Sequence, residues 1–200
     1  MTIEQLLGVA AGLSLLAGWR LYLCLFAMGL ALKTGLIAPP AHFAVVQMLA
    51  HPWVISLMAI AALAECISDK TPWLDSLWDA AHGVLRPIGG AGVALAIGDP
   101  SQPVWQIITL LLGAGGAMIS HRAKAGSRAI INASPEPFSN ITVSLGEDIV
   151  AAGLLILLFF APVAAGLIAG LLILGDLALI AAVRRMLDRM FTPPKQTPPA

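Results

Sequence analysis

The sequence predicts an all-α polytopic integral membrane protein. Three observations predict this fold class: 58% of the 200 residues are hydrophobic, 11% are charged, and the apolar residues gather in long runs. An ordinary soluble domain is about 25% charged, and a small chain has too much surface for its volume to hide so many apolar side chains from water. The bilayer is the solvent that fits, and helices satisfy their own backbone hydrogen bonds there.

The first apolar run covers residues 3–32 and is interrupted near Gly18 and Arg20. One straight helix of that length would measure about 45 Å, which exceeds a hydrocarbon core of about 30 Å. The run is therefore either two half-spans bent at Gly18 or one tilted helix with Arg20 buried. Residues 33–43 follow as a loop, because they hold a glycine and two consecutive prolines.

The next two segments are also interrupted. Residues 45–64 form an apolar region that the sequence "HPW" divides. Thr71 as the cap and Pro72 at the first helical position then start another helix. We expect a new, short segment of small residues to open at Pro87.

Two further apolar runs complete the membrane part. Residues 104–119 form a cleaner span, and the basic segment "SHRAKAGSR" follows it. After a polar break, residues 141–174 form a long run that we expect to bend at Pro162. These lengths predict about five to seven spans, several of them broken or re-entrant.

The C-terminal end is basic and then rich in proline. Arg184, Arg185 and Arg189 close the last apolar run, and membrane proteins keep such residues on the cytoplasmic side. We therefore predict a single transmembrane domain over residues 1–190, a disordered cytoplasmic tail over residues 191–200, and a cytoplasmic C-terminus.

The order of motifs repeats along the chain. An Ala-Gly-x-Arg motif, an acidic pair, a proline-led segment of small residues and a Gly-Asp pair occur within residues 8–100 and again within 113–180. We interpret this order as a degenerate internal duplication, with chance similarity between aliphatic sequences as the alternative. Duplicated halves with Gly/Pro-interrupted helices are typical of small transporters, whose sites lie near the bilayer midplane.

Ionisable residues within the apolar runs require an explanation. A charge at the centre of a membrane helix costs roughly 2.5–3.5 kcal/mol on insertion scales. Such residues either pair with one another and lock the bundle, or they line an aqueous path for protons or substrate. Arg20, flanked by apolar residues on both sides, would pair with a carboxylate such as Glu147 or Glu65 in the first case. We predict that six residues serve ion or proton coupling: Glu65, Asp69, Asp79, His82, Glu147 and Asp148.

The sequence "DSLWDAAHGVLRP" draws one polar line along a helix. Four ionisable residues spaced four, three and four apart share one helical face: Asp75, Asp79, His82 and Arg86. This helix either lies on the membrane surface with its polar face toward water, or lines a cavity or packs against Arg128 and Lys124. His82 titrates near neutral pH and is either a proton acceptor or a hydrogen-bonded structural residue.

The junction "NASPEPFSN" contains a predicted helix start beside basic residues. Helix N-termini attract anions, so this junction either binds a carboxylate or phosphate or is an ordinary turn with capping residues. We predict that six residues bind the substrate: Arg20, Arg128, Asn132, Ser134, Ser139 and Asn140.

Several classes of protein are not expected. The sequence has no H-E-x-x-H, G-x-S-x-G or P-loop motif, so we expect no enzyme. Cys24 and Cys66 have no metal-ligand spacing, and we expect neither a metal nor a cofactor. The formal net charge is zero and no long basic run exists, so a nucleic acid is not an expected partner.

Three segments of the chain resemble a known family. They are "AGWRLYLCLFAMGLALKTG", "AECISDKTPWLDSLWDAAHGVLRPIGGA" and "AKAGSRAIINASPEPFSNITVSLGEDIV". They are similar to bacterial membrane proteins grouped as domain-of-unknown-function family 4126, over about Gly8 to Leu174. The resemblance implies a bacterial inner membrane and brings no activity with it.

These observations together predict a small transporter or flippase for an anionic, zwitterionic or lipid-like substrate, with proton or ion coupling. The alternatives are an ion channel with a continuous wet pore, and a non-transporting scaffold or assembly protein with closed charge pairs. We expect so small a chain to form a homodimer in the lipid bilayer. Glycines that would allow close helix contact in it are Gly89, Gly90 and Gly92, or Gly166 and Gly170.

Overall fold

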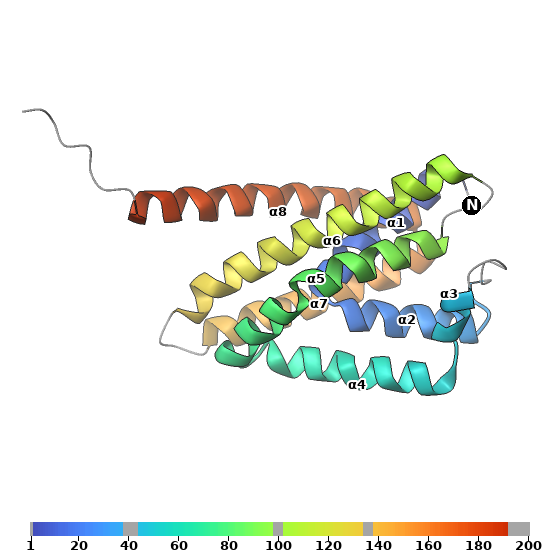
Figure 1. Ribbon diagram of the computed structural model, residues 1–200, viewed down its shortest axis with the longest axis horizontal. Coiled ribbons are helices and arrows are strands. Elements are labelled where there is room, and N and C mark those ends of the chain that lie inside the picture. Colours follow the sequence, from blue (N-terminus) through green and yellow to red (C-terminus); the bar gives the residue numbers. More distant parts are fainter. Residues whose placement is uncertain (1, 38–43, 98–101, 134–137, 192–200) are drawn as a thin grey trace, which may run out of the picture.

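The computed structural model consists of helices throughout the residues that it describes, which are 2–37, 44–97, 102–133 and 138–191 (Figure 1). This architecture confirms the all-α fold class. The last helix extends to Phe191, so the first residue of the predicted tail is helical. The rest of that tail, residues 192–200, lies outside the described residues.

The N-terminal run folds as a hairpin of two helices, α1 (Ile3–Trp19) and α2 (Leu21–Lys33). Between them Arg20 adopts φ −143° and ψ 68°, a conformation outside the helical region. Gln5 near the start of α1 and Leu36 beyond the end of α2 line the same pocket, so the hairpin begins and ends on one side of the bundle. The chain therefore enters the bundle and returns to the same side as a re-entrant hairpin. Arg20 lies buried at the tip of this hairpin. The run is therefore two helices and not one tilted helix, with the break at Arg20 instead of Gly18, and Arg20 is buried although the helix is broken.

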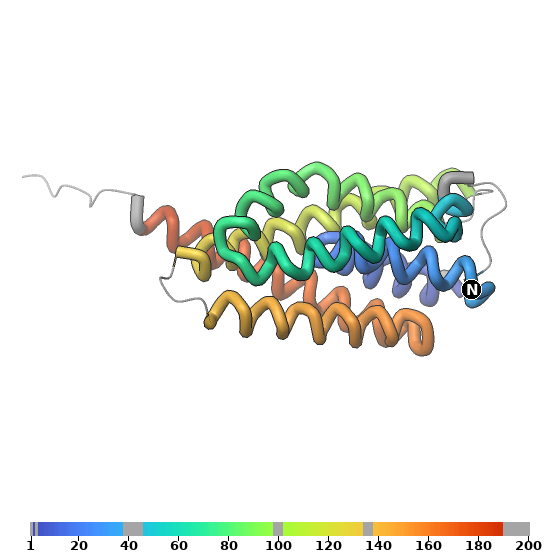
Figure 2. Tube along the Cα trace, turned by 90° about the horizontal axis from the view of Figure 1, so that it is seen from below, coloured from blue at the N-terminus to red at the C-terminus, as the bar shows by residue number. Residues whose placement is uncertain are grey.

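The remaining helices run back and forth along the bundle (Figures 1 and 2). They are α3 (Ala44–Leu49), α4 (Pro52–Ser68), α5 (Pro72–Ile97), α6 (Pro103–Asn132), α7 (Phe138–Phe160) and α8 (Pro162–Phe191). Within the described residues, α5, α6, α7 and α8 are long and apolar enough to cross a membrane. The apolar helix α4, with 17 residues, reaches the lower end of the usual length range. The chain is therefore a multi-pass membrane protein.

The two ends of the bundle are distinct. The N-terminus and the start of α8 lie at one end, which we call the N-side, and the end of α8 lies at the other, which we call the C-side (Figure 1). Helix α8 extends beyond the other helices at the C-side. Figure 2 shows α7 along one edge of the bundle.

Three helix boundaries differ from the sequence predictions. Helix α5 continues through Pro87, although proline removes one backbone hydrogen bond, because neighbouring helices support such positions in a membrane bundle. Helix α6 continues through the basic segment to Asn132, since Lys124 and Arg128 are buried against carboxylates. Around Pro162 the chain reverses instead of bending, so that α7 and α8 are separate, antiparallel helices.

Glycines bring the helices into close contact. A Cβ on Gly166 would meet the backbone of Gly8, and a Cβ on Gly90 would meet the backbone of Gly113. Small residues are what membrane helices use for such contacts. Gly89, which faces Leu21, is also used inside the chain, so these three of the predicted dimer-contact glycines pack within one protomer. Gly92 and Gly170 face open space.

The predicted duplication stays a prediction. The first Ala-Gly-x-Arg motif ends at the helix break of the hairpin, whereas the second ends at Arg128 inside the continuous helix α6. The two motifs therefore have different local structures.

Candidate functional site

The bundle buries a group of ionisable side chains beside its apolar core, and its outer surface is rich in large apolar side chains. Glu65 and Arg86 have no exposed side-chain surface, whereas Trp73 is 71% exposed. This distribution fits a bundle whose outer face meets hydrocarbon, because charged groups inside a membrane protein turn toward one another.

The polar line on α5 faces this interior. Asp75, Asp79, His82 and Arg86 are buried. The opposite face is exposed at Trp73, Leu77 and Val84. A surface helix with its polar face toward water is therefore wrong for this segment, and the polar line packs against other helices instead.

Arg86 joins three elements. Its Nη2 donates to Glu65 Oε1 on α4 at 3.0 Å, and its Nη1 donates to the Gly18 carbonyl at 2.7 Å. The same Nη1 lies 3.5 Å from Asp79 Oδ1 and 3.1 Å from His121 Nδ1. Because a guanidinium only donates, His121 Nδ1 accepts, and the proton of a neutral His121 is then on Nε2.

Two cations occupy the end of α1. The break at Arg20 leaves the last carbonyls of α1 without partners within the helix. Arg86 donates to the Gly18 carbonyl, and Lys124 Nζ donates to the Trp19 carbonyl at 3.2 Å. Positive charge is favourable at a helix C-terminus, so the broken helix is stabilised by residues of α5 and α6.

Arg20 lies at the centre of a second group of charges. It pairs with Asp69, and its Nη2 lies 2.5 Å from Asp148 Oδ1 and 3.9 Å from Glu147 Oε2. Lys124 pairs with the same Asp69 and lies 3.8 Å from Glu147. The hairpin tip is thus connected to the turn after α4 and to α7. Of the two predicted partners of Arg20, only Glu147 is near, while Glu65 pairs with Arg86.

Arg128 lies at the centre of a third group of polar and charged side chains, nearer the C-side. Its Nη2 donates to Glu147 Oε2 at 2.7 Å, and its Nη1 donates to the Asp69 carbonyl at 3.1 Å. The Asn140 side chain also accepts from Nη1. Glu147 therefore lies within ion-pair distance of cations from the hairpin tip and from α6.

The predicted substrate junction is only partly assembled. Asn140 contacts Arg128, whereas Asn132 donates to Asp75 Oδ2 at 2.8 Å. Ser139 is partly buried on α7. Ser134 lies outside the described residues.

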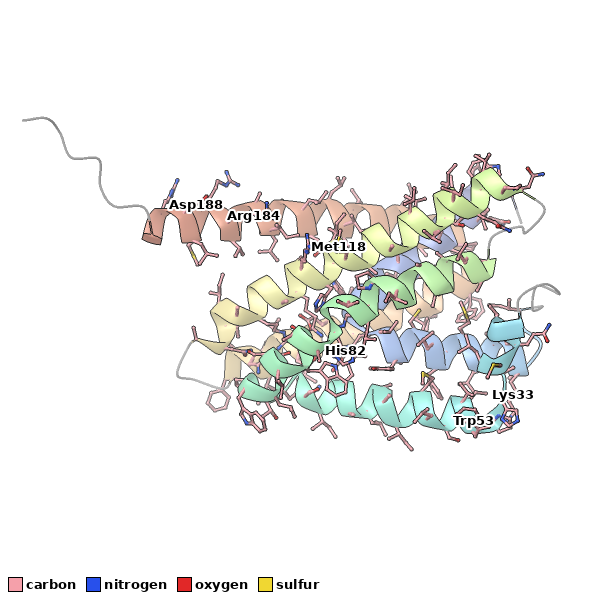
Figure 3. The ribbon with its side chains drawn as sticks, in the orientation of Figure 1. Lys33, Trp53, His82, Met118, Arg184 and Asp188 are labelled. Carbon is pink, nitrogen blue, oxygen red and sulfur yellow. The ribbon has the colours of Figure 1, made fainter. Side chains whose placement is uncertain are left out.

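His82 occupies a structural position on α5 (Figure 3). Its Nδ1 lies 2.7 Å from the Trp78 carbonyl, which only accepts, so this nitrogen carries the proton. Its Nε2 then accepts from the Tyr22 hydroxyl at 2.8 Å, and its ring stacks on Trp78. Both ring nitrogens have partners, which matches the structural alternative for His82 and not a free proton acceptor.

Lys70 and Asp148 form the partly exposed rim of the network. Lys70 Nζ lies 2.9 Å from Asp148 Oδ2 and 3.3 Å from Ser144 Oγ. It also lies 3.1 Å from Cys66 Sγ. This rim is where the buried charges come closest to solvent or headgroups.

The network holds one more carboxylate than it holds lysines and arginines. The carboxylates are Glu65, Asp69, Asp75, Asp79, Glu147 and Asp148. The cations are Arg20, Lys70, Arg86, Lys124 and Arg128. Neither oxygen of Asp79 accepts a hydrogen bond, and Asp75 has no ion-pair partner among the described residues. A buried surplus of negative charge favours the uptake of a proton or another cation.

Five residues of the network and its surroundings are absent from the predicted site: Lys70, Asp75, Arg86, His121 and Lys124. Asp75 and Arg86 belong to the predicted polar line but have no predicted role in substrate binding or coupling. His121, Lys124 and Arg128 are spaced three and four apart, which is a second polar line on one helical face. This spacing is the sequence signal for a buried polar face on α6. The prediction that the segment follows the span of residues 104–119 leaves that face out.

No group of three or more His, Cys, Asp and Glu residues that could hold a metal ion is present in the part of the chain that the structure describes.

A match to the family described as "Domain of unknown function (DUF4126)" covers residues 7–183, and the chain belongs to this family. The match confirms the resemblance found in the sequence. No curated protein and no solved structure matches the chain.

Proposed function

We propose that this member of the DUF4126 family is a small proton-coupled transporter or flippase for an anionic or zwitterionic substrate. The observation that carries the proposal is the buried network around Arg20, which joins the tip of a re-entrant hairpin to α6, α7 and the turn after α4. Ionised groups inside a membrane are costly and mark substrate or proton paths. Transporter sites also form where helices are discontinuous within the membrane.

The charge pairs provide a mechanism for coupling. A substrate anion would need Arg20 and Lys124 as its binding cations. Both cations are already in ion pairs with Asp69 and Glu147. Protonation of either carboxyl removes its negative charge and frees its partners for the anion. Substrate and proton then bind together, which is the basis of symport.

The hairpin is the element that would respond to this exchange. Its helices have 17 and 13 residues, and the chain turns back at Arg20, inside the bundle. Its tip is held by ion pairs from Arg20 to Asp69 and Asp148. Replacing these carboxylates by a substrate anion would loosen the tip from α7 and from the turn after α4, and so couple binding to movement.

The orientation follows from the end of α8. Arg184, Arg185 and Arg189 are exposed at the C-side, and such residues favour the cytoplasmic face. We infer that the C-side faces the cytoplasm in a bacterial inner membrane, with the rim at Lys70 and Asp148 nearer that face.

The test is transport by purified protein in vesicles. Vesicles containing a pH-sensitive dye are offered a panel of carboxylates and organophosphates, and a true substrate acidifies the lumen. Arg20→Ala and Glu147→Gln are expected to abolish this signal at unchanged expression, while Asp188→Asn on exposed α8 keeps it. Full activity in both network variants would show that the site is misassigned. Proton flux without any substrate would indicate a channel.

A non-transporting scaffold is the second candidate, and one observation favours it. Every lysine and arginine of the network lies within 4.0 Å of a carboxylate. A scaffold needs the ion pairs only for packing of the helices, so it tolerates the loss of both charged partners of a pair together. The double variant Arg128→Gln with Glu147→Gln therefore separates the candidates: a scaffold keeps its assembly and its cellular role, whereas a transporter loses transport.

A further inference from the structure

We propose that an apolar pocket on the N-side binds the hydrocarbon chain of a membrane lipid. The pocket has a volume of about 390 Å³ and lies between α1, α2 and α7. Its walls include Leu13 from α1, Cys24 and Met28 from α2, and Leu158 from α7. Gln5 supplies the polar side chain of a lining that is otherwise apolar.

Water is a poor occupant of this pocket. A buried water needs two to four polar partners, and an apolar cavity of about 150 Å³ stays dry and accepts an apolar molecule instead. The pocket exceeds that volume and offers the Gln5 side chain as a polar partner. An apolar molecule is therefore the occupant that the lining favours.

A second apolar pocket extends the first toward the bilayer. It has a volume of about 320 Å³, lies along α2, and shares Leu36, Leu155 and Phe159 with the first pocket. Leu23 and Phe26 on α2 line it further out. The two pockets therefore lie side by side between α2 and α7, and we call the pair the apolar track.

The mouth of the track identifies the source of the chain. Phe160, which lines the first pocket, is 84% exposed at the end of α7, and Leu36 is also exposed. Phe160 ends the membrane-crossing helix α7, so this mouth lies near the boundary where the hydrocarbon chains of the lipids begin. A lipid chain can enter sideways from the bilayer without crossing water.

The inner wall of the pocket approaches the charged network. Cys24 lies on α2 one helical turn after Arg20, on the same face. A lipid whose chain fills the track would therefore place its other end toward the hairpin tip. Identifying this lipid with the transported molecule rests on the proposed function, whereas binding of the chain does not.

Photo-cross-linking tests the chain site directly. The purified protein is placed in phosphatidylethanolamine–phosphatidylglycerol bilayers that contain a phospholipid with a diazirine in its acyl chain. Labelled positions are then mapped by peptide mass spectrometry. We expect labelling at buried Leu13, Met28 or Leu158, in addition to bilayer-facing residues such as Leu167. Labelling confined to exposed residues would overturn the proposal.

A pocket-filling variant sharpens the test. Val9→Phe narrows the pocket and is expected to reduce labelling at Leu158 several-fold. Val163→Phe, at an exposed position of α8, adds the same bulk elsewhere and should leave the labelling unchanged. Undiminished labelling in folded Val9→Phe protein argues against the pocket. If that variant does not fold, the positions labelled in the unmodified chain decide. Labelling of the pocket residues in a protein that transports no substrate would support the binding site for the lipid chain. It would refute only the proposed transport function.

Discussion

Among the buried carboxylates, Asp79 has the surroundings that most favour the protonated form of the side chain. Arg86 lies 3.5 Å away but also donates to Glu65, and His121 is 3.9 Å away. Neither Asp79 oxygen accepts a hydrogen bond. The other charged groups that act on it come from the turn after α4 and from α6: Asp69, Lys124 and Arg128. Since a buried carboxylate without donors is costly to ionise, we expect Asp79 to carry a proton in the arrangement described.

Infrared difference spectroscopy checks this expectation without a substrate. Raising the pH of the protein in lipid bilayers should remove the C=O stretching band of a buried carboxylic acid. Asp79→Asn should lack that band, while Asp188→Asn, on the exposed end of α8, should retain it. Identical difference spectra for Asp79→Asn and the unmodified chain would assign the proton elsewhere, with Asp75 as the next residue to change.

At the residue scale, the sequence identified groups but not their partners. The spacing of Asp75, Asp79 and His82 placed them on one helical face, and the structure has them there. The partner of Arg20 was not predictable, because Asp69 is 49 residues away and five other carboxylates of the network were equally available. Pairing depends on how the helices pack, and that information is not local in the chain.

At the element scale, the break between α1 and α2 depends on close packing at Gly18. A Cβ at this position would meet the Ser120 side chain and the Ala117 backbone of α6. The close approach also allows Ser120 to donate to the Leu15 carbonyl at 3.2 Å. Glycine at position 18 therefore sets the depth at which Arg20 meets its partners.

Substituting this glycine tests the packing. Gly18→Ala should destabilise the protein by about 1–3 kcal/mol, as overpacking of a tight core does. Gly92→Ala, on α5 facing open space, should be neutral or slightly stabilising, because alanine favours a helix by about 1 kcal/mol. Unfolding in mixed micelles measures both values. Equal stabilities of the two variants would mean that α1 and α6 do not pack as closely as described.

Helix starts were predictable from the sequence, and helix ends were less so. Proline stands at the first helical position of α4, α5, α6 and α8, which is a local signal. The continuation of α6 through its basic segment was not predictable, because it requires that Lys124 and Arg128 be buried against carboxylates of other elements. Local sequence alone made that segment resemble a loop beside the membrane.

At the scale of the whole molecule, composition was sufficient to predict an all-α membrane protein, but the sidedness of the chain depends on the hairpin. If α1 and α2 together crossed the membrane, the N-terminus would lie on the same side as the C-terminus. Because the hairpin re-enters, the five following helices α4 to α8 place the two termini on opposite sides. The topology therefore depends on the break at Arg20.

Cysteine labelling decides between these topologies. In a chain with Cys24 and Cys66 replaced by serine, single cysteines are introduced at the exposed positions Glu4, Thr34 and Asp188. A membrane-impermeant maleimide applied to intact cells should modify Glu4→Cys and Thr34→Cys, and applied to inside-out vesicles it should modify Asp188→Cys. Modification of Glu4→Cys and Thr34→Cys from opposite sides would mean that the N-terminal run crosses the bilayer. Arg20 would then lie within a through-going span instead of at the tip of a hairpin, and the coupling proposed for that tip would lose its structural basis.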